Sequence, residues 1–486
     1  MTLEFEPGDV GAVRRHLQVA DPQGLLAPCG IDRVILGRDC IRGLSSVVRG
    51  VVGANGSGRR PKVVLLVDET PILRTGKDLK SLVEAQLQAD LDFHKCVLSD
   101  GYPVLHASET VLEEATGLVV GADVVVTIGG GTMTDIGKVA THSAGDIPHV
   151  AVQTAASVDG FTDNVSVILR DGVKRTVPSR WPTAVVSDTE TISGAPPEMN
   201  RAGYGELISM FTAPADWRLA SLLGVDTTFH PATTELLAAA GHGIEKWSPG
   251  VGRAEPEAVE RLTWALAVRG IVTGVAGTTA CLSGVEHLVS HMLDLYHGQR
   301  GMPTGLHGAQ VGVASILAAA AWEMMFERAG SGGVHLAKRW RLPDPANARR
   351  SVSQAFSELD PSGKVEAECW RDYEQKLHDW ERSAGAVFFA LENWDVVRKD
   401  LMPLAASSRL LATGLKNAGS AYRFDQLTPA VTDDLVQWAL RNCGLMRKRT
   451  TVVDLLTFLG WWGPSDVEEV MSRAAEAWRT EVRDDE

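Results

Sequence analysis

Three consecutive glycines stand directly after a run of apolar, β-branched residues in the first third of the chain. Residues 122–128 carry the pattern of a buried strand, the glycines occupy 129–131, and residues 132–138 continue with helical spacing. A strand, tight turn and helix in this order expose backbone N–H groups at a helix N-terminus, where they can bind a pyrophosphate. The turn lacks the full G-x-G-x-x-G spacing, so it predicts a nucleotide site without identifying the nucleotide.

The rest of the first 190 residues alternates between expected strands and expected helices. We predict strands at 33–36, 62–67, 104–105, 122–128, 149–152, 165–170 and 184–186, and helices from about residue 40, at 77–93 and at 111–121. This alternation is typical of an α/β domain with a mostly parallel sheet, which binds a nucleotide at the carboxyl ends of its strands.

Around residue 194 the pattern changes to helices. We predict helices at 203–224, 233–247, 256–274, 278–297, 306–328, 364–395, 398–416, 431–446 and 465–482. The chain is therefore expected to contain an α/β domain at 1–194, which carries the nucleotide-binding turn, and an all-α domain at 195–486. Residues 330–430 form an extra helical region in which the sequence indicates no chemistry.

One carboxylate and three histidines in the second half are candidates for a metal site. His287 and His291 are four residues apart in a helical segment, so their side chains share one helix face. His307 stands at the start of another expected helix, and Glu206 opens a further one. Imidazole and carboxylate are ligands for a divalent metal, and three protein ligands leave a position for substrate. Spacing alone favours His287 and His291 as the ligand pair, and it is equally consistent with buried polar residues of a helical core.

Charge and composition restrict the partners and the location. The net charge of −14 argues against nucleic acid or an anionic membrane as partner. The six cysteines are scattered without a C-x-x-C pair, as in a reducing compartment. Residues 1–25 contain four acidic residues and no long apolar segment, so we expect no signal peptide. We also expect no membrane-spanning segment, a cytoplasmic location, and a homodimer as the commonest oligomer.

Seven segments, in order from the first domain almost to the C-terminus, match one protein family. They are GGGTMTDIGK (129–138), TAASVDGF (154–161), VVSDTETISGAP (185–196), AGYGELISMFTAPADWRLA (202–220), SGVEHLVSH (283–291), LHGAQVGV (306–313) and RKRTTVVDLL (447–456). Together they resemble the sn-glycerol-1-phosphate dehydrogenase family, in the group that contains dehydroquinate synthase and metal-dependent alcohol dehydrogenases. The resemblance implies a dehydroquinate synthase-like architecture and an NAD(P)-dependent, metal-containing oxidoreductase that acts on CH–OH groups.

The resemblance also implies roles for individual residues. It assigns the cofactor to Gly129, Gly130, Gly131, Asp135, Thr154 and Ser157, the metal to Glu206, His287 and His307, and catalytic contacts to Asp159 and His291. His291 would then face the substrate, where it can donate or relay a proton. The implied cofactors are NAD(P)H and a divalent metal, which we expect to be zinc, with nickel and iron also suited to the ligands. The implied substrate is a small phosphorylated ketone, with dihydroxyacetone phosphate and glycerol 1-phosphate as the family pair.

Two residues depart from the family pattern. The family normally has Asp at the position of Glu206, and the longer side chain moves the ligand oxygen by about one methylene, on the order of 1–1.5 Å. Glu at this position resembles the dehydroquinate synthase branch. Asp163 stands where the glycerol-phosphate enzymes usually carry a small hydroxyl residue, and a carboxylate there could repel a pyrophosphate. The first departure affects which substrate the site accepts. The second affects both the substrate and the binding of the cofactor.

These departures leave two alternative functions open. One is a sugar-phosphate cyclase that retains NAD, although residues 207–210 lack the lysine that dehydroquinate synthases usually carry there. The other is a non-catalytic homologue. Cations that could bind a substrate phosphate are present, but none is assigned to the site: they are Arg170, Lys174, Arg175, Arg180, Arg447, Lys448 and Arg449. Asp68 follows the expected strand at 62–67. Its side chain could bind a ribose hydroxyl of the cofactor, or it could be a turn residue.

Overall fold

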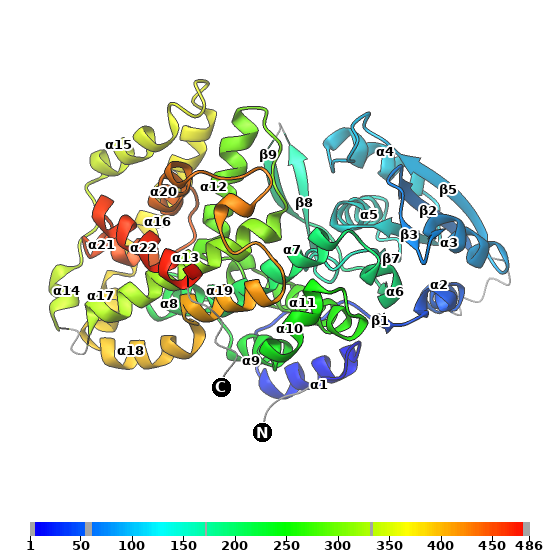
Figure 1. Ribbon diagram of the computed structural model, residues 1–486, viewed down its shortest axis with the longest axis horizontal. Helices are drawn as coiled ribbons and strands as arrows, with labels where there is room; N and C mark the ends of the chain where they lie inside the picture. Colours follow the sequence, from blue (N-terminus) through cyan, green and yellow to red (C-terminus); the bar gives the residue numbers. More distant parts are fainter. Residues whose placement is uncertain (1–4, 54–60, 171–172, 331–333, 480–486) are drawn as a thin grey trace. The chain divides into compact units, whose positions relative to one another are not determined.

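Two structural units share the chain, and each is assembled from two separate stretches of sequence. The computed structural model describes residues 5–53, 61–170, 173–330 and 334–479 (Figure 1). Unit 1 comprises residues 1–204 and 230–277, and unit 2 comprises residues 205–229 and 278–486. The domain division at residue 194 stays a prediction. The two units differ from it because the helical residues 230–277 pack with the α/β part of the chain.

Unit 1 is built on a six-stranded parallel sheet. In spatial order its strands are β1 (Arg33–Gly37), β10 (Ala184–Asp188), β7 (His149–Gln153), β6 (Val124–Gly129), β2 (Lys62–Asp68) and β5 (Asp92–Leu98). All pairings within this sheet are parallel. Because β5 lies outside β2 and β6 lies on its other side, the strand order reverses between β2 and β6. In open parallel sheets, nucleotides bind beside the carboxyl ends of the strands at such a reversal.

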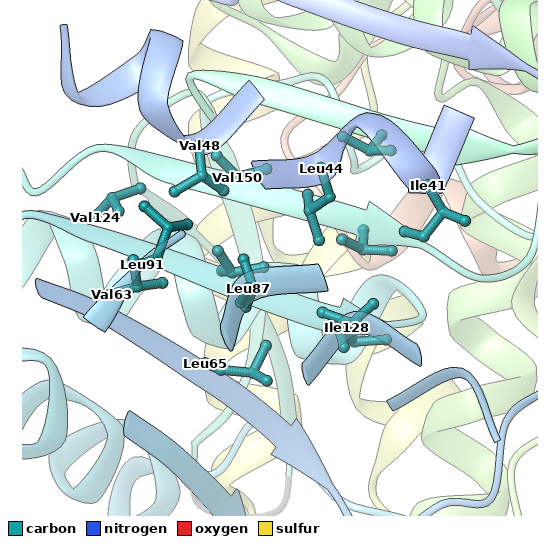
Figure 2. Close-up of a cluster of buried hydrophobic side chains, with 14 of the residues drawn as sticks. Ile41, Leu44, Val48, Val63, Leu65, Leu87, Leu91, Val124, Ile128 and Val150 are labelled. Atoms are coloured by element: carbon teal, nitrogen blue, oxygen red, sulfur yellow. The ribbon is translucent and has the colours of Figure 1, made fainter. Parts of the chain in front are cut away.

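Helices pack on both faces of the sheet, as a parallel sheet requires. The helices of unit 1 are α1 (Val10–Ala20), α2 (Leu44–Val52), α3 (Leu79–Gln88), α4 (Glu109–Val119), α5 (Gly131–Ser143), α6 (Thr189–Ser193), α9 (Pro231–Ala240), α10 (Ile244–Gly252), α11 (Pro256–Ala276) and the short η1 (Cys40–Gly43). Alternate residues of β2 contribute to two cores. Val63 and Leu65 pack with α2 and α3 (Figure 2), and Val64 and Leu66 pack with α4 and α5.

Two small antiparallel hairpins complete unit 1. One consists of β3 (Leu73–Arg74) and β4 (Lys77–Asp78), and the other of β8 (Val165–Arg170) and β9 (Val173–Pro178). The predicted strand at 165–170 is therefore present, outside the parallel sheet. The predicted strand at 104–105 is wrong. The strand in this part of the chain is β5, at one edge of the sheet, and its first residues were assigned to the helix that ends at Gln88. An edge strand exposes one face, so the polar residues of β5 concealed its period.

Unit 2 is almost entirely helical. Its helices are α8 (Ala213–Leu222), α12 (Val285–Gln299), α13 (His307–Ala329), α14 (Val334–Arg339), α15 (Pro345–Phe356), α16 (Lys364–Arg382), α17 (Ala384–Glu392), α18 (Trp394–Leu401), α19 (Ser408–Asn417), α20 (Asp433–Asn442), α21 (Val452–Phe458), α22 (Pro464–Arg479), and the short η2 (Ser209–Phe211), η3 (Thr279–Cys281), η4 (Met402–Leu404), η5 (Phe424–Gln426) and η6 (Cys443–Leu445). Helix α7 (Pro197–Ile208) begins in unit 1 and ends in unit 2. The predicted α/β part followed by a helical part is confirmed.

Five of the predicted long helices are interrupted within the described residues. Two of them, 233–247 and 278–297, divide after α9 and after η3. The segment 203–224 divides at η2, 364–395 divides at Ser383, and 398–416 divides at η4. Prolines account for two of the breaks, because Pro214 and Pro403 sit at the first positions of the helices that follow. Residues 480–482 of the last predicted helix lie outside the described residues.

Helix α13 is the centre of unit 2. It is long and apolar enough to pass a test for membrane spans, contrary to our expectation of no such segment. However, 83% of its most apolar window is buried inside the protein, where it packs against α12, α19 and α22. A core helix of a water-soluble protein has the same length and composition, and its burial explains the apolar surface of α13.

Candidate active site

The glycine turn joins β6 to α5 at the carboxyl end of the sheet, as predicted. A Cβ on Gly129 would lie 2.6 Å from Met133 Cγ, and a Cβ on Gly131 would lie 2.9 Å from Val158 Cγ2. A side chain at either position would therefore have to displace Met133 or Val158. Gly130 is the N-cap of α5 and offers no side-chain cap to the helix. The first N–H groups of α5 are thus placed beside the strand ends for an anionic ligand.

Thr154 and Ser157 lie on the neighbouring turn, directly after β7. β6 and β7 are adjacent parallel strands, so their carboxyl ends lie side by side, and Thr154 N–H donates to Gly129 O at 3.2 Å. Both side chains are buried. Asn200 Oδ1 accepts Ala156 N–H at 2.9 Å and holds this turn to α7. The structure thus brings five of the six predicted cofactor residues to the same end of the sheet.

Asp135, the sixth of these residues, faces into the protein. Its carboxylate pairs with Lys138 Nζ at 2.9 Å and accepts Val167 N–H at 3.1 Å. Lys138 is fully buried and also donates to Asp163 Oδ1 at 2.6 Å and to Gly160 O at 2.8 Å. Burial raises the pKa of Asp163, Lys138 opposes the shift and Asp135 adds to it, with a result of about 7. The positive charge of Lys138 therefore compensates the negative charge of Asp163, the residue that departs from the family pattern.

Asp159, a predicted catalytic residue, is paired with an arginine of α11. Both Nε and Nη2 of Arg269 lie 3.1 Å from Asp159 Oδ2. Arg269 is fully buried, and Asp159 retains partial exposure. The loop is pressed closely onto α11, because a Cβ on Gly270 would lie 2.4 Å from Asp159 O. Thr162 Oγ1 donates to Ala267 O at 2.7 Å and fastens the same loop.

The three predicted metal ligands form a cluster within unit 2. Glu206 comes from the last turn of α7, His287 from the first turn of α12 and His307 from the first residue of α13. One ligand atom from each lies within 4.8 Å of the others. His287 Nε2 is 3.2 Å from Glu206 Oε1, and His307 Nε2 is 3.7 Å from Glu206 Oε2. Glu206 and His287 are buried.

The chemistry of this cluster fits a divalent cation. Its ligand atoms are the carboxylate oxygens and imidazole nitrogens that bind such ions. Burial lowers the pKa of His287, but the carboxylates of Glu206 and Glu286 outweigh this effect and raise the pKa to about 9. A positive charge between these two carboxylates is therefore favoured, and a metal ion can supply it in place of a proton.

His291 lies beside this cluster without joining it. Its ring centroid is 5.7 Å from that of His307, with the rings nearly parallel, and 6.3 Å from that of His287. Burial, followed by the charges of His307 and His287, lowers the pKa of His291 well below its usual value. Arg447 and Arg449 contribute in the same direction, so positive charges gather around His291.

The cations that the sequence offers for a substrate phosphate, none of them assigned to the site, mostly have partners within the protein. Arg170 pairs with Glu109 at 2.7 Å, and Arg180 donates to Ile147 O at 3.1 Å. In unit 2, Arg447 pairs with Glu368 at 3.2 Å. Arg449 donates to Ser283 O at 2.6 Å and to the hydroxyls of Ser283 and Thr279, and Lys448 is exposed. The side chain of Lys174 lies outside the described residues.

The turn at the end of β2 uses Asp68 internally. Asp68 Oδ1 pairs with Lys80 Nζ at 3.0 Å, and Asp68 Oδ2 accepts Thr70 Oγ1 at 2.7 Å. Of the two interpretations from the sequence, these contacts match that of a turn residue.

Sequence reasoning missed two functional neighbours, Glu286 and Arg269. Glu286 Oε1 lies 3.0 Å from His287 Nδ1, and Arg269 pairs with Asp159 as described above. Each left a signal in the sequence. An arginine inside the apolar helix α11 must have a buried partner, and an acid adjacent to a candidate ligand is a candidate for its orientation.

Comparisons with known proteins match this architecture and these segments. A family model described as iron-containing alcohol dehydrogenase matches residues 45–196. The glycerol-1-phosphate dehydrogenase [NAD(P)+] of Pyrococcus furiosus is 31% identical over 289 residues, which cover 59% of this chain and 77% of that relative. That of Bacillus licheniformis is 27% identical over 357 residues, with coverages of 73% and 82%. For that of Halalkalibacterium halodurans the identity is 30% over 54% of this chain, and the match spans 65% of the relative's length.

Solved structures share the fold at low sequence identity. A probable glycerol dehydrogenase from Sinorhizobium meliloti 1021 aligns with a TM-score of 0.56 at 14% identity and covers 92% of this chain and 98% of that one. Glycerol dehydrogenase from Schizosaccharomyces pombe aligns with a TM-score of 0.55 at 15% identity, with coverages of 91% and 89%. The dehydroquinate synthase-like fold predicted from the sequence is thus confirmed. Given the Pyrococcus furiosus relative in particular, this chain belongs to the glycerol-1-phosphate dehydrogenase family.

Proposed function

We propose that this protein is a metal-dependent NAD(P)H oxidoreductase that reduces a small phosphorylated ketone to a polyol phosphate. Dihydroxyacetone phosphate and glycerol 1-phosphate are the proposed pair. The observation that carries the proposal is the cluster of buried Glu206 and His287 with half-buried His307, whose ligand atoms lie within 4.8 Å of one another. The names of the relatives, glycerol-1-phosphate dehydrogenase [NAD(P)+], support both the cofactor and the substrate.

The residues of unit 1 bind the nucleotide in this proposal. The N–H groups at the start of α5 bind the pyrophosphate beside Gly129, Gly130 and Gly131, and Thr154 and Ser157 contact the cofactor from the next turn. Lys138 supports this role because it compensates Asp163 and so limits repulsion of the phosphates. The bound nicotinamide supplies the hydride.

The residues of unit 2 polarise and protonate the substrate. Glu206, His287 and His307 hold the divalent metal, which when bound acts as a Lewis acid on the carbonyl oxygen. His291 exchanges a proton with the substrate oxygen, and its place one helical turn after His287 supports this role. In unit 1, Asp159 is oriented by Arg269 and is the proposed contact for a substrate hydroxyl.

Several finer properties belong to the same proposal. We propose zinc as the metal, because two imidazoles and one carboxylate with an open position are a common catalytic zinc set. Nickel and iron also suit these ligands. The proposed location is the cytoplasm, and the proposed assembly is a homodimer without nucleic-acid or membrane partners.

The experiment measures metal content and cofactor stoichiometry together. Purified protein loaded with Zn²⁺ is given dihydroxyacetone phosphate with NADH or NADPH, and the absorbance of the reduced nicotinamide is followed. We expect one NAD(P)H to be oxidised for each ketone reduced. His307→Ala should lose both metal and turnover, whereas the matched variant His378→Ala, on an exposed position of α16, should keep both. A protein that binds neither metal nor nucleotide would support the non-catalytic alternative and contradict the proposal.

Glu206 favours the cyclase as a second candidate function. Dehydroquinate synthases resemble this chain in having a glutamate at that position, although Leu207, Ile208, Ser209 and Met210 supply no lysine after it. A cyclase would release inorganic phosphate from its substrate without net oxidation of NAD(P)H. The same assay therefore separates the two functions when phosphate release is recorded beside absorbance.

A further inference from the structure

Both histidines of the metal cluster are held by a hydrogen-bonding partner on the ring nitrogen that faces away from Glu206. His287 Nδ1 lies 3.0 Å from Glu286 Oε1, and His307 Nδ1 lies 3.1 Å from Ser290 Oγ. In each ring the other nitrogen, Nε2, is the one that faces Glu206. An imidazole can bind a metal only through a nitrogen that carries no proton, so the partner of Nδ1 decides whether Nε2 can act as ligand.

Glu286 can only accept a hydrogen bond from His287. Its Oε1 already accepts Gly284 N–H at 2.6 Å, and its Oε2 accepts Thr212 Oγ1 at 3.0 Å. Both of these donors hold the carboxylate in place, and Glu286 is fully buried. Because a carboxylate presents lone pairs only, Glu286 keeps a proton on His287 Nδ1, and Nε2 is the nitrogen that gives up its proton when a metal binds beside Glu206.

Ser290, together with Gln310, also places a proton on Nδ1 of His307. The Ser290 hydroxyl donates its single proton to Gln310 Oε1 at 2.7 Å. Its oxygen can therefore only accept from His307 Nδ1, which places the proton of that ring on Nδ1 as well. Ser290 and Gln310 are buried, so bulk water does not compete for these bonds.

We propose that Glu286, Ser290 and Gln310 are positioning residues that fix the Nδ1–H tautomers of His287 and His307 and so present both Nε2 lone pairs to the cation. The proposal rests on the metal site of the proposed function. Partners of this kind orient ligands in many metal sites, and their loss typically weakens metal affinity by about 10–100-fold. All three residues act through the two histidines.

The test measures Zn²⁺ affinity by competition with a chromophoric chelator, independently of turnover. Ser290→Ala and Glu286→Leu each remove an acceptor and should weaken Zn²⁺ binding by about 10–100-fold. Glu286→Gln keeps an oxygen opposite His287 Nδ1 and should bind Zn²⁺ nearly as tightly as the native protein. Ser315→Ala is the matched control: Ser315 is a buried serine of α13 whose hydroxyl donates only within its own helix, to Val311 O at 2.9 Å, and its loss should leave affinity unchanged.

The outcomes separate this inference from the proposed function. Ser290→Ala that is folded and binds Zn²⁺ as tightly as the native protein would overturn the tautomer proposal and leave the metal site intact. If Glu286→Leu fails to fold, Ser290→Ala still decides the result. A native protein that binds no Zn²⁺ would overturn both proposals. Native binding with the expected losses, but without ketone reduction, would support the positioning residues and contradict the proposed activity.

Discussion

Gly205→Ala tests whether close helix packing sets the geometry of the metal cluster. A Cβ at Gly205 would lie 2.2 Å from Gly308 O and 3.0 Å from Gly308 C. The shorter distance is roughly 1 Å less than an ordinary van der Waals contact, and the opposing atom is rigid backbone. The end of α7 must therefore move away from the start of α13.

This movement has two consequences of predictable size. Overpacking of this kind lowers the free energy of unfolding by about 1–3 kcal/mol. Glu206 and His307 are the neighbours of the two glycines in the chain. A displacement of about 1 Å exceeds the tolerance of about 0.2 Å on metal–ligand distances, so we expect Zn²⁺ affinity to fall at least about tenfold.

The assay compares urea unfolding and Zn²⁺ affinity with a control glycine of the same unit. Gly298 lies on an exposed position of α12, and a Cβ there would have no atom within 4 Å. Gly298→Ala should therefore raise the free energy of unfolding by about 0.4–1 kcal/mol and leave Zn²⁺ binding unchanged. A Gly205→Ala protein with native stability and native Zn²⁺ affinity would refute the argument that these glycines set the site.

Three further substitutions test the remaining assignments. The pKa of Asp163 rises from 3.8 to about 7 in the folded state, which binds this proton more tightly than the unfolded chain. Stability should therefore fall as the pH rises from about 4 to about 7, and Asp163→Asn should flatten that fall in a pH series of urea unfolding curves. His291→Ala should retain Zn²⁺ and lower turnover by roughly 10²–10⁴-fold, and a loss of metal instead would make His291 a ligand. Glu206→Asp should retain Zn²⁺, and a higher rate on dihydroxyacetone phosphate would indicate that Glu206 serves another substrate.

Local patterns predicted the parts of the fold that short-range interactions specify. The glycine turn after β6 and the strands β2, β6, β7 and β10 were identified because buried parallel strands are continuous apolar runs between turn residues. The edge strand β5 was missed because half of its surface is exposed and its sequence, from Asp92 to Leu98, mixes charged and apolar residues. Helices α9, α10 and α11 show their helical period, but no local signal assigns them to unit 1.

The candidate site shows a similar division at the level of single residues. His287 and His291 are related by helical spacing, so the sequence alone places them on one face. The buried pair of Lys138 and Asp163 could not be predicted, because it joins a helix to a loop that follows the next strand. From the sequence alone, the negative charge of Asp163 conflicts with phosphate binding. In the structure, the positive charge of buried Lys138 compensates it.

The sequence by itself determined the chemical groups available and their order: a glycine turn for an anion, one carboxylate and three histidines. Helical spacing favoured His287 with His291, and the family resemblance named His287 with His307 instead. Only the tertiary structure decided that the ligand atoms of His287 and His307 lie within 4.8 Å of those of Glu206 and of one another. The reason is physical: the choice depends on how closely α7 and α13 approach at Gly205 and Gly308, and such packing between distant segments leaves no periodic signal in either one.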